Sequence, residues 1–433
     1  MVKSKISKGL VLIALLTTQS CMKDVSIVPD DQPSIKKVQD LEIPLDFDWS
    51  TSRNITCTIN SGSPASIEIY TDEACEEELL AALITQQGAN ELAMPVSQAT
   101  DKLYLKYKTT AGSYNVLTGD VENAVVAFNV TDGVLAEQSE TRSAVTRDVP
   151  IENHIGYIAY PAGWGTVMFE DQFPSIGDYD FNDLVASYQI STEFPWVDGK
   201  YDTKQVSLIR VHLKLKAIGG SLKFTPYVRI KGLNRENVTL PNPAYGDPLY
   251  VNPKIVNNTN DGVEVALINS TRTTDAIIEF KNLNESNPKK VPGGSFYNTT
   301  PGFLTKDNQL TQVTVYLALT KNVDAKSVLD DKIDIFLASA DKTKEIHVRG
   351  FEPVFNPYNF DEKGVSKTVP YASENNLVWG IKIATRVKYA IEKVNFCEAY
   401  PDFASWAESG GISNMDWYKT NLVNDKLITL PAK

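Results

Sequence analysis

Apolar and polar residues alternate one by one along much of this 433-residue chain, and a period of two is typical of β-strands. In residues 206–215, one set of alternate positions is mostly apolar and the other mixes apolar with charged residues. We interpret His212, on the mixed face, as a strand residue rather than a metal ligand. Similar patterns recur at 54–59, 66–70, 102–108, 313–319, 333–337 and 377–383. The sequence therefore predicts an all-β protein with two β-sandwich-like domains.

Shifts in composition divide the chain into segments. Residues 41–130 are predicted to form a small N-terminal β-sandwich domain, followed by a polar, weakly patterned linker at 131–150. Residues 151–433 are predicted to form a second β-rich domain with long loops at 234–261 and 282–302, where binding surfaces tend to lie.

Two segments have the spacing of helices instead. Glu76–Leu83 is predicted as a short helix within the first domain. Glu398–Ser409, with Phe403 and Trp406 on one face, is predicted as a short C-terminal helix that stops at Gly410-Gly411.

Residues 1–21 are predicted to be a lipoprotein signal peptide. Three lysines precede a short apolar run at positions 9–16, which is too short to span a bilayer as a helix. Cys21 is the predicted lipidation site, and in the alternative, an ordinary secretory signal, this cysteine is incidental. Residues 22–40 contain acids and proline and are predicted to be a flexible tether. We expect a lipid anchor in the outer membrane; whether the protein faces the periplasm or the cell exterior stays open.

The charge balance argues against one class of partner. The chain has 42 Lys and Arg against 54 Asp and Glu, a net charge of −12, and no cluster of basic residues. We expect no nucleic-acid binding, because phosphate contacts need concentrated positive charge.

Cysteine and histidine usage also limits the chemistry. Cys57, Cys75 and Cys397 include no Cys-x-x-Cys pair, which argues against structural zinc. Cys57 and Cys75 either form a disulfide or stay buried thiols, and both alternatives remain open. The sequence has only three histidines, so catalysis built on histidine pairs is not expected.

A short acidic segment is the strongest candidate site. Asp178, Asp180 and Asn182 stand at i, i+2 and i+4, so in an extended backbone their side chains point the same way. Calcium prefers such oxygen ligands, and no Lys or Arg within the segment offsets the repulsion between the carboxylates. An EF-hand is excluded, because its sixth position is Asp183 rather than Gly and its twelfth is Gln189 rather than Glu.

The predicted metal ligands are Asp178, Asp180, Asn182, Asp183 and Asp171, with calcium as a structural cofactor. A main-chain carbonyl, a water or a further acid such as Glu170 would complete the roughly six to eight oxygens that calcium takes. The alternative is a cluster of Asx turns, in which the side chains bond nearby N–H groups and the intervening aromatics pack inward.

No enzyme signature accompanies these acids. The chain lacks a Gly-x-Ser-x-Gly elbow, a His-Glu-x-x-His motif and a phosphate loop. Nothing apolar is evident near the acidic segment to raise the pKa of one carboxyl, as glycosidases require. We predict that the protein is not an enzyme, with a glycoside hydrolase as the least favoured alternative.

Four segments together resemble a known family. The run FEDQFPSIGDYDFNDLV at Phe169–Val185 is similar to the signature of LruC-domain lipoproteins of Bacteroidetes, the domain of unknown function DUF4842. The other similar segments are Glu345–Pro353, Ala399–Gly411 with Asp416–Tyr418, and, more loosely, Phe47–Thr51. One departure is Gln172-Phe173, where the family usually has Leu-Trp. The resemblance implies a secreted or outer-membrane-anchored β-rich protein, and it implies no enzymatic activity.

Taken together, the sequence predicts a cell-envelope lipoprotein with a calcium-stabilised β-sandwich domain that recognises glycan or protein. Trp164, Trp196 and Tyr245 are candidates for stacking on sugar rings, and burial in the core is the alternative for each. The second candidate function is a structural or adhesive cell-surface component that binds other proteins, which an apolar patch or a free sheet edge would favour.

Overall fold

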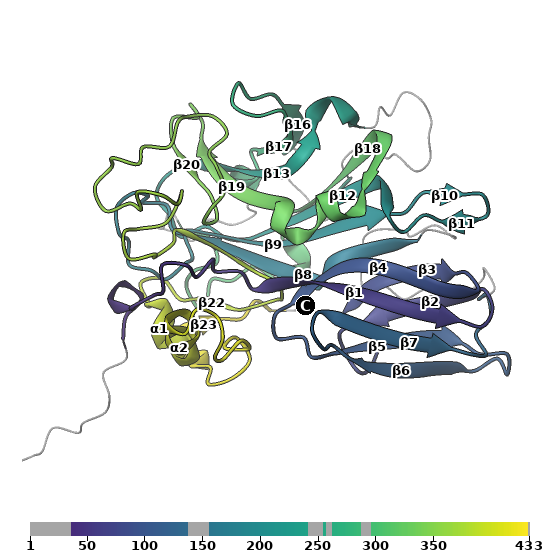
Figure 1. The fold of residues 1–433 in the computed structure, drawn as a ribbon. Coiled ribbons are helices and arrows are strands. Elements are labelled where there is room, and N and C mark those ends of the chain that lie inside the picture. The colour runs from purple at the N-terminus through teal and green to yellow at the C-terminus, as the bar shows by residue number, and fades with distance from the viewer. Residues whose placement is uncertain (1–35, 137–155, 241–253, 257–261, 287–295, 432–433) are drawn as a thin grey trace, which may run out of the picture. The chain divides into compact units, whose positions relative to one another are not determined.

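Mostly antiparallel strands form the main regular elements of the structure, a computed structural model that describes residues 36–136, 156–240, 254–256, 262–286 and 296–431 (Figure 1). The strands form sheets of eleven, five and three strands and two small two-stranded sheets. The predicted all-β class is confirmed.

Seven strands between residues 52 and 130 form a small sandwich. They are β1 (Ser52–Ser61), β2 (Ala65–Tyr70), β3 (Leu79–Thr85), β4 (Gly88–Ser97), β5 (Lys102–Lys108), β6 (Tyr114–Asp120) and β7 (Val125–Val130). One layer is the three-stranded sheet β4-β1-β7, in which β1 and β7 are parallel, and the other layer contains β3-β2-β5-β6. Alternate apolar residues of both layers, such as Ile59, Leu92 and Leu105, are fully buried in one core.

The eleven-stranded sheet continues from this sandwich into the C-terminal part of the chain. Its order is β14-β18-β12-β9-β8-β3-β2-β5-β6, with β15 also paired to β18 and β21 to β8. The added strands are β8 (Tyr157–Phe169), β9 (Leu184–Glu193), β12 (Gln205–Ala217), β14 (Val238–Thr239), β15 (Lys254–Val256), β18 (Gln312–Asp324) and β21 (Gly380–Ile383). A short antiparallel pairing, Ala81 with Ile158 and Ala82 with Tyr157, joins β3 to β8.

A five-stranded sheet shares a second core with the large sheet. Its order is β16-β17-β13-β19-β20, and its strands are β13 (Phe224–Asn234), β16 (Glu264–Ile268), β17 (Asp275–Lys281), β19 (Ile333–Ser339) and β20 (Glu345–Ile346). Val211 and Leu213 of β12 are fully buried in that core together with Val228 and Ile278. The two small sheets pair β10 (Trp196–Val197) with β11 (Lys200–Tyr201), and β22 (Tyr389–Ala390) with β23 (Leu427–Ile428).

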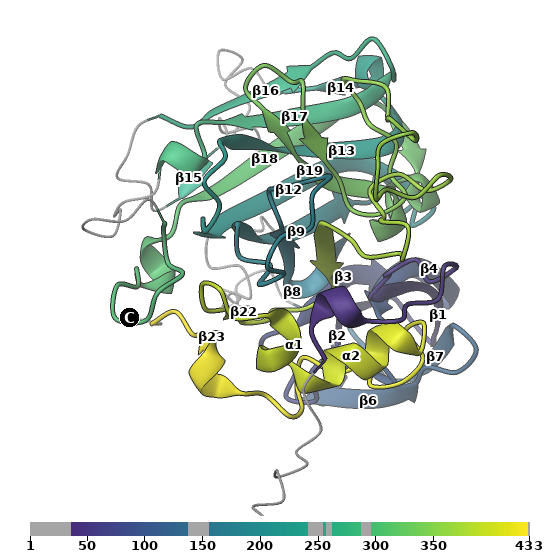
Figure 2. The same cartoon turned by 90° about the vertical axis from the view of Figure 1, so that its left-hand side faces the viewer.

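Two short helices close the C-terminal part of the chain. They are α1 (Phe396–Ala399) and α2 (Pro401–Glu408), and α2 confirms the helix predicted at Glu398–Ser409. Gly410 and Gly411, with φ values of 68° and 82°, end α2 as expected. Figure 2 shows these helices beside the first described residues, and Trp49 shares a core with Phe403 and Trp406. The 3₁₀ turns are Val38–Asp40, Arg235–Asn237, Asn284–Ser286, Asp307–Gln309, Ala325–Val328, Asp330–Lys332 and Asn424–Lys426.

The helix predicted at Glu76–Leu83 is wrong. The carboxylate of Asp72 accepts the backbone N–H groups of Glu76 and Glu78, which holds a turn in place of a helix. The chain then enters β3, because residues 79–85 pair along their length with β2. Tertiary pairing overrides local helical spacing here.

The predicted domain boundaries stay predictions. Residues 1–35 and 137–155, which contain the predicted signal peptide, Cys21, most of the tether and most of the linker, lie outside the described residues. At the end of the predicted tether, Val38 is buried and its N–H donates to Asn395 Oδ1. No helix in the described ranges is long and apolar enough to cross a membrane.

Candidate metal centre

The acidic turn connects β8 to β9 as a kinked loop rather than an extended strand. Tyr179 and Phe181 have φ values of 55° and 51°, a region that bulky side chains seldom adopt. Both side chains are fully buried, and the ring of Phe181 packs edge-on against Phe396 at a centroid distance of 5.4 Å. Strained residues of this kind persist only where the surrounding structure holds them in place.

Four hydrogen bonds fasten this turn to the segment that leads into α1. They run from Phe396 N to Tyr179 O (2.8 Å), Asn395 Nδ2 to Asp178 O (3.0 Å), Lys393 N to Asp180 Oδ2 (2.7 Å) and Asn182 Nδ2 to Ala390 O (3.3 Å). The turn therefore joins two parts of the chain that are more than 200 positions apart.

Three carboxylates meet at the turn. One oxygen of each of Glu170, Asp178 and Asp180 lies within 4.8 Å of the others. Glu170 and Asp180 are buried and Asp178 is exposed, so the cluster opens to solvent on one side. Gly177 is needed for this approach, because a Cβ atom there would lie 2.3 Å from Glu170 Oε2. The spacing fits one shared calcium ion, since oxygens bound at roughly 2.3–2.6 Å lie within about 5 Å of one another.

The expectation that nothing apolar near the acidic segment would raise the pKa of a carboxyl is wrong, because burial and mutual repulsion raise the pKa values of these acids. Burial, followed by the charges of Asp183 and Asp180, raises the pKa of Glu170 well above its ordinary value. Burial, followed by the charge of Asp178, raises the pKa of Asp180 to about 8. Such a carboxyl group retains its proton near neutral pH unless a cation compensates its charge.

The backbone bonds of the cluster leave oxygen lone pairs for a cation. Glu170 and Asp180 each accept two N–H groups, and a carboxylate has about four lone-pair sites. The donors are Phe181 (2.7 Å) and Tyr179 (3.3 Å) for Glu170, and Lys393 (2.7 Å) and Asn182 (3.1 Å) for Asp180. Among the described residues, no ion pair involves these two acids or Asp178. The donor set therefore fits a hard divalent cation.

The structure brings together part of the predicted ligand set. Asp178 and Asp180 meet, and Glu170, considered from the sequence only as an additional acid, is their third partner. Asp171 and Asp183 form a neighbouring pair in which the N–H of Asp171 donates to Asp183 Oδ2 (2.7 Å). Burial raises the pKa of Asp183 to about 7, and Asp171 and Asp178 add to the rise.

Asn182 is fully buried, and its role as a ligand stays a prediction. Its Oδ1 atom lies against Gly219, where an added Cβ would come within 2.0 Å of it, and this oxygen has no hydrogen-bond partner among the described residues. The positive φ values on either side of Asp180 break the regular alternation that would have aligned Asn182 with Asp178 and Asp180.

Sequence reasoning missed one acid near the cluster. Glu392 is half-buried, and its pKa is raised by burial and then by the charge of Asp178. No motif marks this residue in the sequence. Only the bonds between the turn and the segment before α1 bring it close, so the spacing of residues could not have revealed it.

The histidine, aromatic and cysteine residues singled out in the sequence lie outside the acidic turn, and among those that the structure describes only Trp196 is exposed. His212 is buried in β12 with Nδ1 3.0 Å from Thr314 Oγ1, as expected of a strand residue. Trp164 is buried and packs edge-on against His212, which agrees with the alternative of burial in the core and not with sugar stacking. Trp196 is 53% exposed, and Tyr245 lies outside the described residues. Cys57, Cys75 and Cys397 are buried free thiols.

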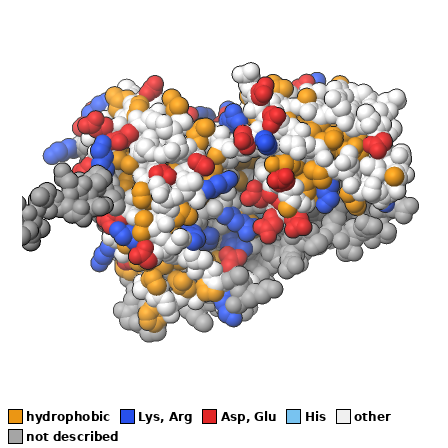
Figure 3. Space-filling model, turned by 90° about the horizontal axis from the view of Figure 1, so that it is seen from below, with side chains coloured by type: hydrophobic (Ala, Val, Ile, Leu, Met, Phe, Trp, Pro, Cys, Tyr) orange, Lys and Arg blue, Asp and Glu red, His pale blue; other side chains and the backbone are white. Residues whose placement is uncertain are grey.

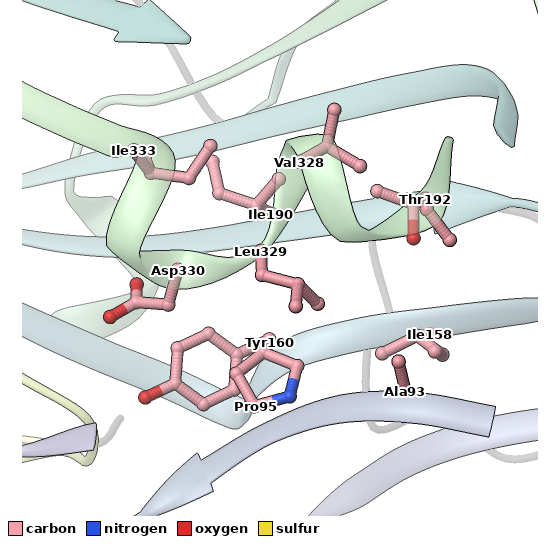
Figure 4. Close-up of a pocket in the computed structure, with 11 residues that line it drawn as sticks. Ala93, Pro95, Ile158, Tyr160, Ile190, Thr192, Val328, Leu329, Asp330 and Ile333 are labelled. Atoms are coloured by element: carbon pink, nitrogen blue, oxygen red, sulfur yellow. The ribbon is translucent and has the colours of Figure 1, made fainter. Parts of the chain in front are cut away.

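A small cavity lies between β4, β8, β9 and the 3₁₀ turns at residues 325–332 (Figure 4). Its volume is about 20 Å³, and apolar side chains such as Ile158, Ile190 and Val328 line most of it. A space of this size accommodates about one water molecule.

The family model of DUF4842, a domain of unknown function, matches residues 204–418. That range contains the predicted family segments at 345–353 and 399–418 and begins after the acidic turn. No curated protein matches the chain.

Two solved structures are similar to the chain. A crystal structure of a protein from Bacteroides ovatus, described as a candidate lipoprotein, aligns with a TM-score of 0.58 and 20% identity over 84% of this chain and 99% of that chain. At this identity, the likeness shows a shared fold. The major pilin subunit BcpA of Bacillus cereus aligns over 68% of this chain and 67% of that chain at 7% identity, and its TM-score of 0.17 carries no structural argument. Residues 204–418 of this chain belong to the DUF4842 family, as the sequence resemblance indicated.

Proposed function

We propose that this protein is a lipoprotein of the cell envelope, anchored in the outer membrane through Cys21, whose β-sandwich domain is a calcium-stabilised binding module. The signal-like first 21 residues support the anchor, and the Bacteroides ovatus protein of the same fold is described as a candidate lipoprotein. The proposed role is recognition of glycan or protein rather than catalysis.

One observation carries the calcium proposal: the convergence of Glu170, Asp178 and Asp180 within 4.8 Å. Glu170 and Asp180 are buried carboxylates without an ion-pair partner among the described residues. A divalent ion would remove their repulsion and fasten the β8–β9 turn against the segment before α1. The metal would thus have a structural role.

The test is thermal unfolding of residues 22–433 with calcium and with a chelator. Calcium at 100 times its Kd would stabilise the folded state by about 2.7 kcal/mol, which raises Tm by several degrees. Asp178→Asn, which removes one exposed ligand charge, should abolish most of this rise. Asp361→Asn, a matched change of an exposed acid outside the cluster, should leave it intact. Equal melting of the wild-type protein in calcium and chelator would refute the metal.

Glycan is the ligand class that a specific observation favours. Trp196 is 53% exposed on the β10–β11 hairpin, with the neighbouring Val197 45% exposed. Tyr201 packs edge-on against the Trp196 ring at 4.7 Å and supports it from the other strand. An exposed, supported aromatic ring suits stacking on a sugar. A glycan-array screen of wild type and Trp196→Ala tests this role, and an array on which the wild-type protein binds no glycan would favour the adhesive alternative.

A further inference from the structure

The two most exposed large hydrophobic side chains of the described chain, and a third that is less exposed, lie near the C-terminal end of α2. Ile412 is 79% exposed, Leu45 is 69% exposed, and Met415 is 41% exposed. These three residues are called the α2 tip below. Single exposed apolar residues are ordinary on protein surfaces, whereas several near one another can mark a contact surface.

Two glycine contacts bring the two chain segments of the α2 tip together. A Cβ atom added to Gly410 would lie 3.7 Å from Pro44, the residue before Leu45. A Cβ atom added to Gly411, the residue before Ile412, would lie 2.7 Å from the ring of Phe47. Figure 3 shows the molecule from below, with hydrophobic side chains at the surface between charged groups of both signs.

The described chain begins on the same helix. Lys36 Nζ lies 2.7 Å from Glu408 Oε1, and the N–H of Glu42 donates to the same oxygen at 3.0 Å. Val38 is buried, with its N–H bonded to Asn395 just before α1. The polypeptide that leads back to Cys21 therefore leaves the folded unit next to α2.

The length of that connection limits how far the helix can lie from the proposed lipid anchor. The fifteen positions from Cys21 to Lys36 span at most about 50 Å when fully extended. As a flexible coil, the predicted tether would have an end-to-end distance of about 20 Å. Such a short link keeps the adjacent surface at an effective concentration in the millimolar range, at which even weak contacts are populated.

We propose that the α2 tip rests on the lipid bilayer that holds the acylated Cys21. This inference rests on the proposed lipid anchor and adds an orientation to it. Aliphatic side chains and methionine enter the interfacial region of a bilayer favourably, and one lipid anchor alone binds more weakly than an anchor with a second contact. Exposed Asp46 and Asp48 beside Leu45 oppose binding to anionic lipid, so the bilayer that fits is zwitterionic at its surface.

The orientation agrees with the position of exposed Trp196, the residue proposed to bind glycan. Figure 1 places the β10–β11 hairpin on the opposite side of the folded unit from α2. With the α2 tip on the bilayer, the β10–β11 hairpin and its exposed Trp196 lie away from the membrane, where a soluble or cell-surface ligand can reach them.

The experiment uses full-length lipidated protein in phosphatidylcholine vesicles that contain doxyl-labelled lipid. Ile412→Cys, Leu45→Cys and the matched control Val197→Cys each receive a fluorescent NBD label under native conditions, in which the three buried native thiols are shielded. We expect at least about twofold stronger quenching at positions 412 and 45 than at position 197. Two test positions guard against misfolding of one variant.

The possible outcomes separate the orientation from the anchor. Vesicle flotation of wild type but not of Cys21→Ala establishes the anchor, and equal quenching at all three positions then overturns the orientation alone. A blue-shifted but unquenched label at position 412 would also overturn it, because protein, such as a second copy of this chain, would then cover the α2 tip. If wild type and Cys21→Ala float equally poorly, the anchor itself is refuted and the orientation with it.

Discussion

At the scale of single residues, a buried histidine has an unusual environment. His347 is fully buried, with Nδ1 2.8 Å from Asp334 Oδ2 and Nε2 3.1 Å from Glu345 Oε2. Both ring nitrogens face carboxylates, so the ring satisfies both partners only when each nitrogen carries a proton. Arg229 lies 3.2 Å from Asp334 and 3.9 Å from Asp275, so a protonated His347 would give two cations for three acids. Phe336 stacks on the imidazole at 4.2 Å. The geometry therefore favours the imidazolium.

This charge state predicts a pH dependence with a definite sign. Burial lowers the pKa of His347, but Asp334 and Glu345 outweigh burial, and the net shift is upward. A histidine whose folded pKa is raised stabilises the protein fully below its unfolded pKa of about 6.5, and this contribution is lost as pH rises through the folded pKa. His347→Gln should cost about 3–5 kcal/mol at pH 6, because it leaves a buried acid unpaired. Urea unfolding of both proteins between pH 6 and 9 measures the difference, which should shrink as pH rises.

A matched histidine provides the control for this measurement. Burial, followed by the charge of Arg210, lowers the pKa of His212 to about 3, so this ring is neutral in the folded protein. Its contribution has the opposite sign: it is present above about pH 6.5 and lost as pH falls below that value. The difference between wild type and His212→Gln should therefore be flat from pH 7 to 9. A His347→Gln difference that grows with pH would contradict the imidazolium.

At the scale of elements, the short helix α1 depends on bonds that its own sequence does not reveal. Asn395 caps it by accepting the N–H of Cys397 (3.3 Å) and also accepts the N–H of Val38 (3.1 Å). Its Nδ2 donates to the carbonyl of Asp178 (3.0 Å) and to Gln39 Oε1 (2.8 Å). One side chain thus links the start of the described chain, the acidic turn and the C-terminal helices.

Asn395→Ala should therefore lower the free energy of unfolding by more than the loss of an ordinary helix cap does. Loss of an N-cap costs about 0.5–2 kcal/mol, and each further buried group left unpaired costs about 1–3 kcal/mol, so we expect a total of at least about 3 kcal/mol. Asn234→Ala is the matched control, because Asn234 caps the turn at Arg235–Asn237 with one local, exposed bond. Chemical denaturation of the two variants compares them. Equal losses would show that the links to Val38 and Asp178 add no stability.

The elements that sequence predicted best are those with regular patterns. The period of two identified β12, although both faces of that strand are buried between residues 208 and 213. The spacing of Phe403 and Trp406 with the following glycines identified α2. The carboxylate cluster was predicted only in part. Asp178 and Asp180 lie close in sequence, but the contribution of Glu170 depends on the bend of the β8–β9 turn and that of Glu392 on tertiary bonds. Local periodicity contains no information about either contact.

At the scale of the whole molecule, the first strands and the C-terminal helices are interlocked. Trp49 is buried in the core of α1 and α2, and its Nε1 donates to the carbonyl of Asn376 (2.9 Å). Thr51 Oγ1 donates to the carbonyl of Lys382 (3.0 Å), and Thr51 directly precedes β1, the first strand of the small sandwich. The β3–β8 pairing adds a second connection between the two parts of the chain. These contacts couple the predicted N-terminal and C-terminal domains energetically.

Coupling of this kind predicts one cooperative unfolding transition for residues 36–433. Trp49→Ala removes a large buried ring and should cost about 3–5 kcal/mol. Because Trp49 precedes β1 but packs with α2, its loss should lower the Tm of the whole protein in differential scanning calorimetry. The calorimetric and van't Hoff enthalpies should still be equal, as they are for a single two-state transition. Trp196→Ala, which removes an exposed ring of the same type, should leave the free energy of unfolding within about 0.5 kcal/mol of that of the wild type. Two separate transitions, of which Trp49→Ala moves only one, would instead mean that the small sandwich unfolds independently of the DUF4842 part of the chain.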